Sequence, residues 1–397
     1  MATTASANAF PDGFTWGTAT AAHQVEGGNT NNDWWEFEHM AGSGCTDSSG
    51  DACDSWNRWP DDADLVAELG LDNYRFSVEW SRIEPAEGEI SRAALGHYRR
   101  QCEGLRERGI DPVVTFHHFT TPCWLVAQGG WESEAAVAYF GRFCRVVAEE
   151  LGDVMTRACT VNEPNIVATM GWHAGLFPPG LADKELSYRV GANLIAGHRA
   201  AVEAIRGAAP GVPVGLTLSM TDYHLAPGGG EQLESIRRHA EDVFLDATAG
   251  DDFLGVQVYT RMRIGPDGWA GHEPGVPVLD MGYEFYPQAL GNCLRRAAAY
   301  TGAAVPLLVT ENGIGTADDD QRIAYVRHAL QGVLDVIAEG IDVRGYTYWS
   351  LLDNFEWAFG YRPRFGLVSV DRTTFARTPK PSAGWLASIV AANALDQ

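Results

Sequence analysis

Residues 158–165 read ACTVNEPN, an apolar run that ends in an amide, a carboxylate and a proline. The first four residues are small or β-branched, as in a buried strand. Asn162 and Glu163 then follow at the point where that strand should end. A strand-end carboxylate that faces water is one explanation, and a functional carboxylate is the other. The stretch by itself leaves both open.

Runs of the same type recur along the whole chain, and helix-length segments separate most of them. The β-rich runs lie at 14–19, 73–78, 112–116, 158–161, 214–219, 253–259, 306–310 and 345–352. Apolar residues at three- and four-residue spacing predict helices over 132–150, 188–207, 232–247 and 322–338. Eight such β-then-α repeats predict an α/β fold, a closed parallel (β/α)8 TIM barrel. An open doubly wound sheet is disfavoured, because ATAAHQVEGG (19–28) is not a phosphate-binding glycine turn.

No linker or low-complexity segment divides the 397 residues, of which 45% are hydrophobic. We therefore expect a disordered arm over 1–9 and one barrel domain over 10–397. In such barrels the active site lies at the C-terminal ends of the strands.

Composition limits the partners and the compartment. The formal charge of −23 disfavours nucleic acid and anionic membrane surfaces. The chain contains no run of about eighteen apolar residues, so no membrane span is expected. The N-terminal residues lack the features of a secretory signal. The seven scattered cysteines form no disulfide framework or metal pair, which favours a cytoplasmic protein with reduced thiols. Cys45 and Cys53 share one loop, and their pairing under oxidation stays open.

A second strand ends in the same way as the first. In PLLVTENG (306–313), Glu311 follows an apolar run and precedes Asn312 and Gly313, which suit a tight turn. Strands four and seven of a barrel place Glu163 and Glu311 on different parts of one rim. Two carboxyl groups in one pocket are what glycosidic bond cleavage requires, one protonated and one ionised. Their separation, which selects retention or inversion, is not written in the sequence.

The motifs resemble those of family 1 glycoside hydrolases, the β-glucosidase and β-galactosidase family. TVNEP (160–164) and VTENG (309–313) resemble the two catalytic signatures of that family. Three further blocks follow the family order: FTWGTATAAHQVEGG (14–28), YRFSVEWSRIEP (74–85) and WSLLDNFEWAFGYRPRFGLVSVD (349–371). The resemblance extends from residue 14 to about residue 385.

The resemblance implies a retaining double displacement. Glu311 would be the nucleophile that forms a glycosyl ester, and Glu163 the acid that protonates the departing aglycone and then activates water. The pKa of Glu163 should therefore lie above its free value. Arg75 matches an arginine suited to keep Glu311 anionic, and Tyr259 matches a tyrosine that donates a hydrogen bond to the nucleophile.

The same resemblance implies a sugar site. Hydroxyl-binding positions of the family are matched by Gln24, His118, Asn162, Glu356 and Trp357. Trp349 matches the platform beneath the ring, and Phe365 lies where the family closes the pocket. Counting back from Pro122 selects His118 rather than His117 as the sugar contact. Glu356 favours a glycone without phosphate, and the presence of Glu163 favours an O-glycoside over a thioglycoside.

Two departures and one loop concern the subsites. Gln257 and Val258 stand where the family often has Asn-Tyr, and Phe119 stands where it often has Trp. The resemblance therefore leaves the contacts of the sugar subsites near these residues open. On the aglycone side we expect a contact from Trp172, in the loop after the fourth strand.

Three functions follow from these residues. The first is a β-glucosidase, with tolerance for galactosides or fucosides, that releases the terminal non-reducing β-D-glycosyl residue of a small-molecule O-glycoside. A variant that transfers the glycosyl group to an alcohol uses the same intermediate. A noncatalytic sugar-binding barrel is disfavoured, because both carboxylates are present. The chemistry requires no metal or organic cofactor, and the natural aglycone and the oligomeric state stay open.

Overall fold

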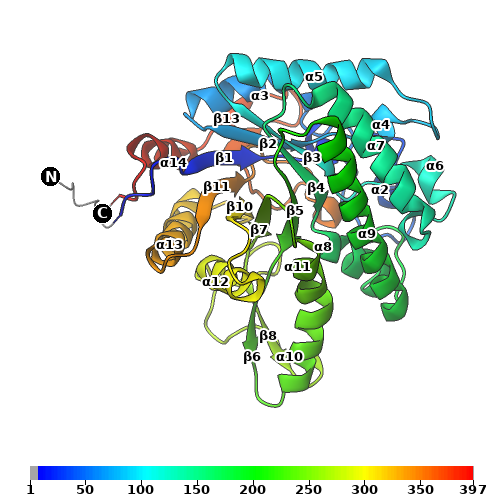
Figure 1. Cartoon of the computed structure of the whole chain (residues 1–397). Helices are drawn as coiled ribbons and strands as arrows, with labels where there is room; N and C mark the ends of the chain where they lie inside the picture. The colour runs from blue at the N-terminus through cyan, green and yellow to red at the C-terminus, as the bar shows by residue number, and fades with distance from the viewer. Residues whose placement is uncertain (1–7, 397) are drawn as a thin grey trace.

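Eight parallel strands close into a barrel in the computed structural model, which describes residues 8–396 (Figure 1). Each strand pairs in parallel with the next, and the last pairs with the first. All eight predicted runs become barrel strands, so the predicted TIM barrel is confirmed. The strands are β1 (Thr15–Ala19), β2 (Asn73–Ser77), β3 (Asp111–His117), β4 (Arg157–Asn162), β5 (Val214–Ser219), β7 (Phe253–Gln257), β10 (Leu307–Asn312) and β11 (Val343–Trp349).

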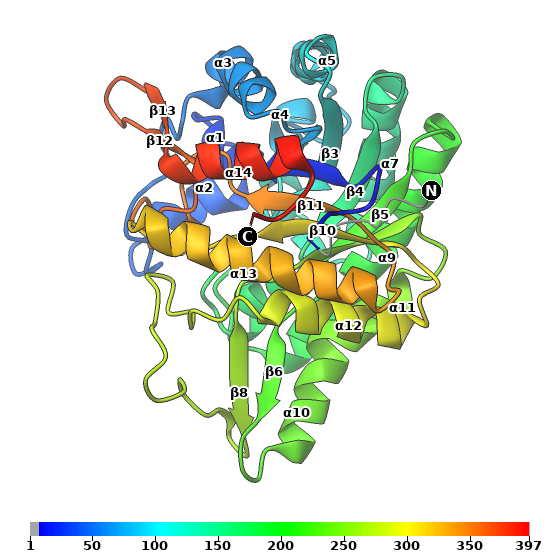
Figure 2. The same ribbon diagram turned by 90° about the vertical axis from the view of Figure 1, so that its left-hand side faces the viewer.

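Long amphipathic helices surround the barrel and shield it from solvent (Figures 1 and 2). The predicted helices at 132–150, 188–207 and 322–338 correspond to α7, α9 and α13. The segment predicted at 232–247 is helical, but its middle turn is a π-helix. The outer helices are α3 (Ser55–Glu68), α5 (Arg92–Glu107), α7 (Ala135–Leu151), α9 (Lys184–Ala208), α10 (Gly230–Arg237), η3 (Arg238–Asp242), α11 (Val243–Ala247), α12 (Ala289–Thr301), α13 (Asp319–Ala338) and α14 (Pro381–Ala392).

Short helices and small sheets follow the strand ends and build the loops around the site. A three-stranded sheet of β6, β8 and β9 extends away from the barrel beside α10 (Figure 2), and the sequence did not predict it. The strands of the small sheets are β6 (Asp222–Leu225), β8 (Arg261–Gly265), β9 (Gly268–Trp269), β12 (Val368–Val370) and β13 (Arg377–Pro379). The short helices are α1 (Ala22–Val25), α2 (Asp33–Glu38), α4 (Trp80–Ile83), α6 (Cys123–Val126), η1 (Gly130–Glu132), α8 (Pro164–Ala168), η2 (Thr169–His173) and η4 (Trp357–Phe359).

The two ends of the described chain meet beside β1. Ala9 forms an antiparallel bridge with Ala394, and the Phe10 amide donates to the Asn393 carbonyl at 2.9 Å. The last residues of the expected arm thus pair with the segment after α14, and residues 1–7 of that arm lie outside the described residues. Within 8–396, no helix is long and apolar enough to cross a membrane.

Candidate active site

The chain geometry at the end of β4 sets the position of Glu163. Glu163 is the first residue after that strand and has a left-handed backbone with φ of +45°, directly before Pro164 opens α8. A left-handed conformation is uncommon for a residue with a side chain, and it turns the chain sharply from strand to helix. The Glu163 amide donates to the Thr217 carbonyl at 2.8 Å, which ties this turn to β5. The strained turn thus holds the carboxyl group at the rim of the barrel.

Glu311 lies inside β10 and its carboxylate is held at both oxygens. Arg75, from β2, donates from Nη1 to Oε1 at 2.5 Å. The Tyr259 hydroxyl, two residues beyond the end of β7, donates to Oε2 at 2.6 Å. Both glutamates line one cavity, as expected for strands four and seven of the barrel. The predicted supporting contacts of Arg75 and Tyr259 are therefore present in the structure.

The two carboxyl groups differ in what surrounds them. Burial raises the pKa of Glu311, but the Arg75 charge and the Tyr259 hydrogen bond oppose that rise. Burial raises the pKa of Glu163 well above its usual value, and the negative charge of Glu311 raises it further. Oε1 of Glu163 is buried without a hydrogen-bond partner among the described residues. Glu163 therefore takes up the shared proton first, and Glu311 is the carboxylate of the pair.

Asn162 is oriented by three donors. Its Oδ1 accepts hydrogen bonds from Arg75 Nη2 at 2.5 Å, Gln257 Nε2 at 3.0 Å and Thr217 Oγ1 at 3.2 Å. Because a guanidinium can only donate, Oδ1 must face Arg75, and Nδ2 then faces His118 at 3.3 Å from Nε2. The longer side chain of Gln257 thus reaches the amide beside Glu163 rather than leaving it unsupported.

A second polar cluster lies around Glu356. Gln24 Nε2 donates to the Phe355 carbonyl at 2.8 Å and lies 3.4 Å from Glu356 Oε2. Burial, then the charge of Glu311, raises the pKa of Glu356 to about 8. Gln24 Oε1 is buried without a partner in the described part of the chain, so an acceptor is left for a ligand hydroxyl.

Aromatic rings complete the inner part of the cavity. The His118 ring is nearly parallel to those of Trp349 and Trp357, with centroids 5.7 and 6.1 Å apart. Burial lowers the pKa of His118 well below its usual value, so its imidazole is neutral. The Phe365 ring packs edge-on against Tyr259. Flat apolar faces beside hydrogen-bonding groups suit a pyranose, which has C–H faces and a rim of hydroxyls.

The structure thus gathers almost all of the predicted site residues. Those that line the cavity are His118, Glu163, Tyr259, Glu311, Trp349, Glu356, Trp357 and Phe365. Arg75 and Asn162 lie directly behind, bonded to one another, and Gln24 contacts Glu356. We call Arg75, Asn162, Glu163, Tyr259 and Glu311 the polar floor.

Trp172 requires a correction. It is 6% exposed within η2, and its indole donates to Glu132 Oε1 at 2.8 Å. It packs into the protein and does not line the cavity, whereas Met170 from the same short helix does. A π-helical turn has a different angular spacing from an α-helix, so a motif match does not tell which of its side chains faces the site.

Most of the side chains that cover the rest of the cavity were not predicted from the sequence. They come from the loops beyond the strands and share an apolar character. We call them the apolar wall: Phe119, Ile166, Met170, Phe177, Met281, Tyr283 and Phe359. Ser219 also lines the cavity as the last residue of β5, and its strand-end position was the signal that could have found it.

The cavity carries no lysine or arginine among its lining residues. In the described residues, no cluster of three or more His, Cys, Asp or Glu side chains could hold a metal ion. The seven cysteines, all within 8–396, are free thiols, including Cys45 and Cys53.

Comparison with known proteins agrees with this geometry. The model of the family "Glycosyl hydrolase family 1" matches residues 6–253 and 267–395. The chain belongs to glycosyl hydrolase family 1. It is thus a β-glycosidase of that family, and its two strand-end carboxyl groups line one cavity.

Relatives in this family resemble the chain over nearly its whole length. A bifunctional β-D-glucosidase/β-D-fucosidase of Bifidobacterium breve is 32% identical, covering 96% of this chain and 98% of that protein. The β-glycosidase BGL167 has a crystal structure with 46% identity and a TM-score of 0.91, and 98% of each chain is covered. A Thermotoga maritima β-glucosidase, solved in complex with deoxynojirimycin, has 30% identity and a TM-score of 0.92. The match covers 98% of this chain and 100% of that chain.

Proposed function

We propose that this protein is a retaining β-glucosidase that also accepts β-fucosides and β-galactosides. The observation that carries the proposal is the unequal setting of the two carboxyl groups. Glu311 is held as an anion by Arg75 and Tyr259, and Glu163 is buried beside it without a partner for Oε1 among the described residues. A nucleophile that stays ionised and an acid that stays protonated are the two roles that a double displacement needs.

In the first step, a Glu311 oxygen attacks the anomeric carbon and the bond to the aglycone oxygen breaks. The electron pair of that bond leaves with the oxygen, which takes the proton of Glu163. A glycosyl ester on Glu311 results, and Glu163 is now an anion. In the second step Glu163 removes a proton from water, the water oxygen attacks the anomeric carbon, and the ester bond breaks. Two inversions give net retention, and both carboxyl groups return to their first states.

The glycone is proposed to be unphosphorylated. Three carboxyl groups, those of Glu163, Glu311 and Glu356, line the cavity, and the lining holds no lysine or arginine to pair with a phosphate. A buried phosphate without a cation would be costly. The relative from Thermotoga maritima binds the sugar analogue deoxynojirimycin, which supports a neutral or cationic sugar-sized ligand here too.

The aglycone is proposed to be aromatic or alkyl rather than a second sugar. The apolar wall holds no carboxylate, amide or basic group among its seven side chains, so it offers little to the hydroxyls of a sugar. Its rings pack against one another, as at Phe119 and Phe177 with centroids 5.6 Å apart, and form a surface that suits an apolar group.

Glycosyl transfer is the second candidate, because the same apolar wall can hold an alcohol in place of water. Hydrolysis of nitrophenyl β-glucoside in the presence of added benzyl alcohol separates the two functions. A transferase gives mainly benzyl glucoside, and a hydrolase gives mainly glucose.

The deciding experiment replaces the nucleophile. Glu311→Ala should lower kcat on nitrophenyl β-glucoside on the order of 10⁵-fold, because no glycosyl ester can form. Added azide should restore turnover with an α-glucosyl azide as product, since it attacks from the vacated face. A β-configured product, or a variant that keeps most of its activity, would contradict the assignment of Glu311. A panel of nitrophenyl glucoside, galactoside, fucoside and 6-phosphoglucoside then ranks the glycones.

A further inference from the structure

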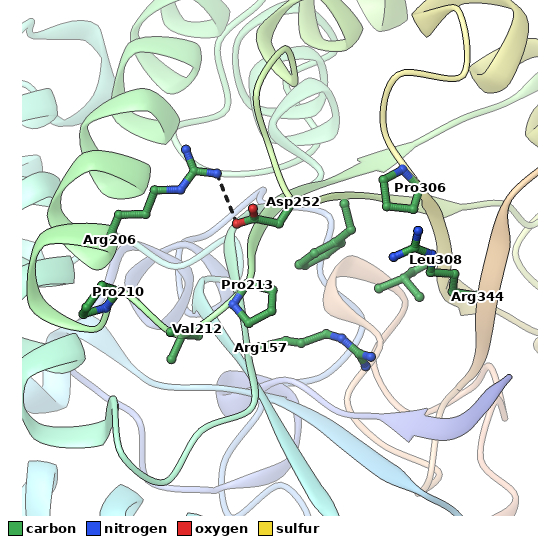
Figure 3. Close-up of a pocket in the computed structure, with 11 residues that line it drawn as sticks. Arg157, Arg206, Pro210, Val212, Pro213, Asp252, Pro306, Leu308 and Arg344 are labelled. Atoms are coloured by element: carbon green, nitrogen blue, oxygen red, sulfur yellow. Dashed lines mark hydrogen bonds and ion pairs between the residues drawn. The ribbon is translucent and has the colours of Figure 1, made fainter. Parts of the chain in front are cut away.

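A second mouth opens at the opposite end of the barrel, around the first residues of several strands (Figure 3). Arg157 begins β4, Phe253 begins β7, and Leu308 and Arg344 are the second residues of β10 and β11. The end of α9 and the loop from Pro210 to Pro213 complete the mouth. The catalytic groups lie at the other ends of these strands, so this mouth belongs to a different site.

The floor of this mouth is apolar and well packed. Phe253 and Leu308 are 3% and 8% exposed, and they form one buried cluster with Val113 and Cys159 inside the barrel. Pro213 and Pro306 line the mouth above them. A ligand with an apolar body therefore finds a rigid surface to cover.

The rim carries three guanidinium groups. Arg206 donates to Asp252 at 3.1 Å, and Arg344 pairs with Asp342 at 2.7 Å, both in ion pairs whose partners are largely exposed. Arg157, half-buried, makes no hydrogen bond or ion pair with any described residue. The mouth is thus a local excess of positive charge in a chain whose formal charge is −23.

Arg157, the one of these three arginines without a partner among the described residues, points most directly to a ligand. A guanidinium has five donors and no acceptor, and its fork matches the two oxygens of a carboxylate or the oxygens of a phosphate. In Figure 3, Arg157 extends toward the side of the mouth where Leu308 and Arg344 lie, and Arg206 lies on the other side beside Asp252. Arg344 donates from Nε and Nη2 to Asp342, and its Nη1 has no partner among the described residues. The guanidinium of Arg157 and Nη1 of Arg344 therefore border the apolar floor with donors left free.

We propose that this mouth binds a small organic anion, a carboxylate or a phosphate carried on an aromatic or aliphatic body. Arg157 and Arg344 hold the charged head, and Phe253, Leu308 and the prolines contact the body. The proposal does not depend on the glycosidase activity, because none of these residues lines the catalytic cavity.

Calorimetric titration of the full chain with four probes tests the proposal. Benzoate and phenyl phosphate represent the two head groups, benzyl alcohol lacks the charge, and inorganic phosphate lacks the apolar body. We expect benzoate, phenyl phosphate or both to bind with 1:1 stoichiometry and a dissociation constant below about 1 mM. Benzyl alcohol and inorganic phosphate should bind at least about tenfold more weakly. The proposal is overturned if benzyl alcohol binds as tightly as benzoate, or if inorganic phosphate binds as tightly as phenyl phosphate. It is also overturned if neither benzoate nor phenyl phosphate binds.

Substitution of the two arginines tests whether the anion binds at this mouth. Arg157→Gln and Arg344→Gln should each weaken binding at least about tenfold. Arg295→Gln is the matched control, because Arg295 is a 38% exposed arginine on α12 that pairs with Glu339, the residue after α13, and it does not line the mouth. Affinity that is unchanged in the first two variants, or equally reduced in all three, overturns the proposal. Since Arg344 has a 60% exposed side chain, its variant is expected to fold normally, which thermal unfolding without ligand verifies.

Kinetics separate this site from the catalytic cavity. Saturating benzoate should leave KM for nitrophenyl β-glucoside unchanged. A rise in KM that persists in Arg157→Gln would place the anion in the catalytic cavity and overturn the proposal. If the protein hydrolyses no glycoside, the calorimetric comparison of Arg157→Gln with Arg295→Gln still decides the anion site.

Discussion

The polar floor and the apolar wall of the cavity around Glu163 and Glu311 are built in different ways. Floor residues stand on or directly after barrel strands, and neighbouring strands supply their partners, as β2 supplies Arg75 to Glu311 of β10. Wall residues stand on short helices and loops, and they hold one another by ring packing. The floor is thus fixed by a hydrogen-bonded barrel, which suits chemistry that needs fixed atoms. The wall can change side chain by side chain, which suits its proposed contact with the aglycone.

Removal of the acid tests the floor most strongly. Glu163→Ala should lower kcat/KM about 10³- to 10⁴-fold for an alkyl glucoside, whose leaving oxygen needs a proton. For dinitrophenyl glucoside the first step should change within about tenfold, because that leaving group needs none. Steady-state and single-turnover kinetics on both substrates measure the difference. An equal loss on both would count against Glu163 as the acid.

Loss of the arginine that joins β2 to β10 comes next. Arg75→Gln should lower kcat about 10²-fold or more, because Glu311 and Asn162 lose a shared donor. Burial raises the pKa of Glu311 and the Arg75 charge opposes that rise, so the acid limb of kcat/KM should move to higher pH. Arg75→Lys keeps the charge and should shift the limb less. A pH profile identical to that of the unchanged protein would show that Arg75 has only a structural role.

The second polar cluster, around Glu356, should have a measurable effect on stability. Burial raises the pKa of Glu356 from 4.5 to about 8, so the folded state holds this proton more tightly than the unfolded chain. The free energy of unfolding should therefore fall as pH rises from about 4.5 to about 8, by a few kcal/mol from this group. Glu356→Gln cannot ionise, and its stability should fall less over the same range. Chemical denaturation at several pH values gives both slopes, and parallel slopes would rule out this contribution.

Truncation within the wall should have the smallest effect. Phe177→Ala should raise KM for an aryl glucoside about 3- to 10-fold with little change in kcat, because an apolar contact to the aglycone is lost. KM for methyl glucoside should not change. Trp172→Phe is the matched control, because it alters the hydrogen bond to Glu132 in the neighbouring segment but not the cavity. A similar rise in KM for both glucosides would place Phe177 in the glycone site instead.

The two regions also differ in how well the sequence predicted them. The floor was predictable because a barrel strand has a regular period, and its end marks the rim on which polar side chains converge. Glu163 and Glu311 were found from this rule alone, before any family resemblance. The wall was not predictable in the same way. Met281 and Tyr283 lie in a segment without helix or strand periodicity. On one π-helical turn, Met170 lines the cavity instead of the predicted Trp172.

Some details of the floor also required the structure. The sequence raised the question of what the longer amide of Gln257 contacts, but it could not answer it. The folded chain brings Gln257, Arg75 and Thr217 to one oxygen of Asn162, although these residues come from four different strands. Contacts of this kind depend on how strands far apart in the chain are paired.

The sequence by itself determined the barrel, the two strand ends that carry the carboxyl groups, and the family motifs around them. The alternation of apolar runs and amphipathic helices encodes those features locally, because burial of each run depends on its own pattern. Only the tertiary structure decided which contacts hold each carboxyl group, which loop side chains line the cavity, and that three arginines share one mouth at the other end of the barrel. Charge, burial and exposure at these places are set by residues that the chain brings together from distant segments.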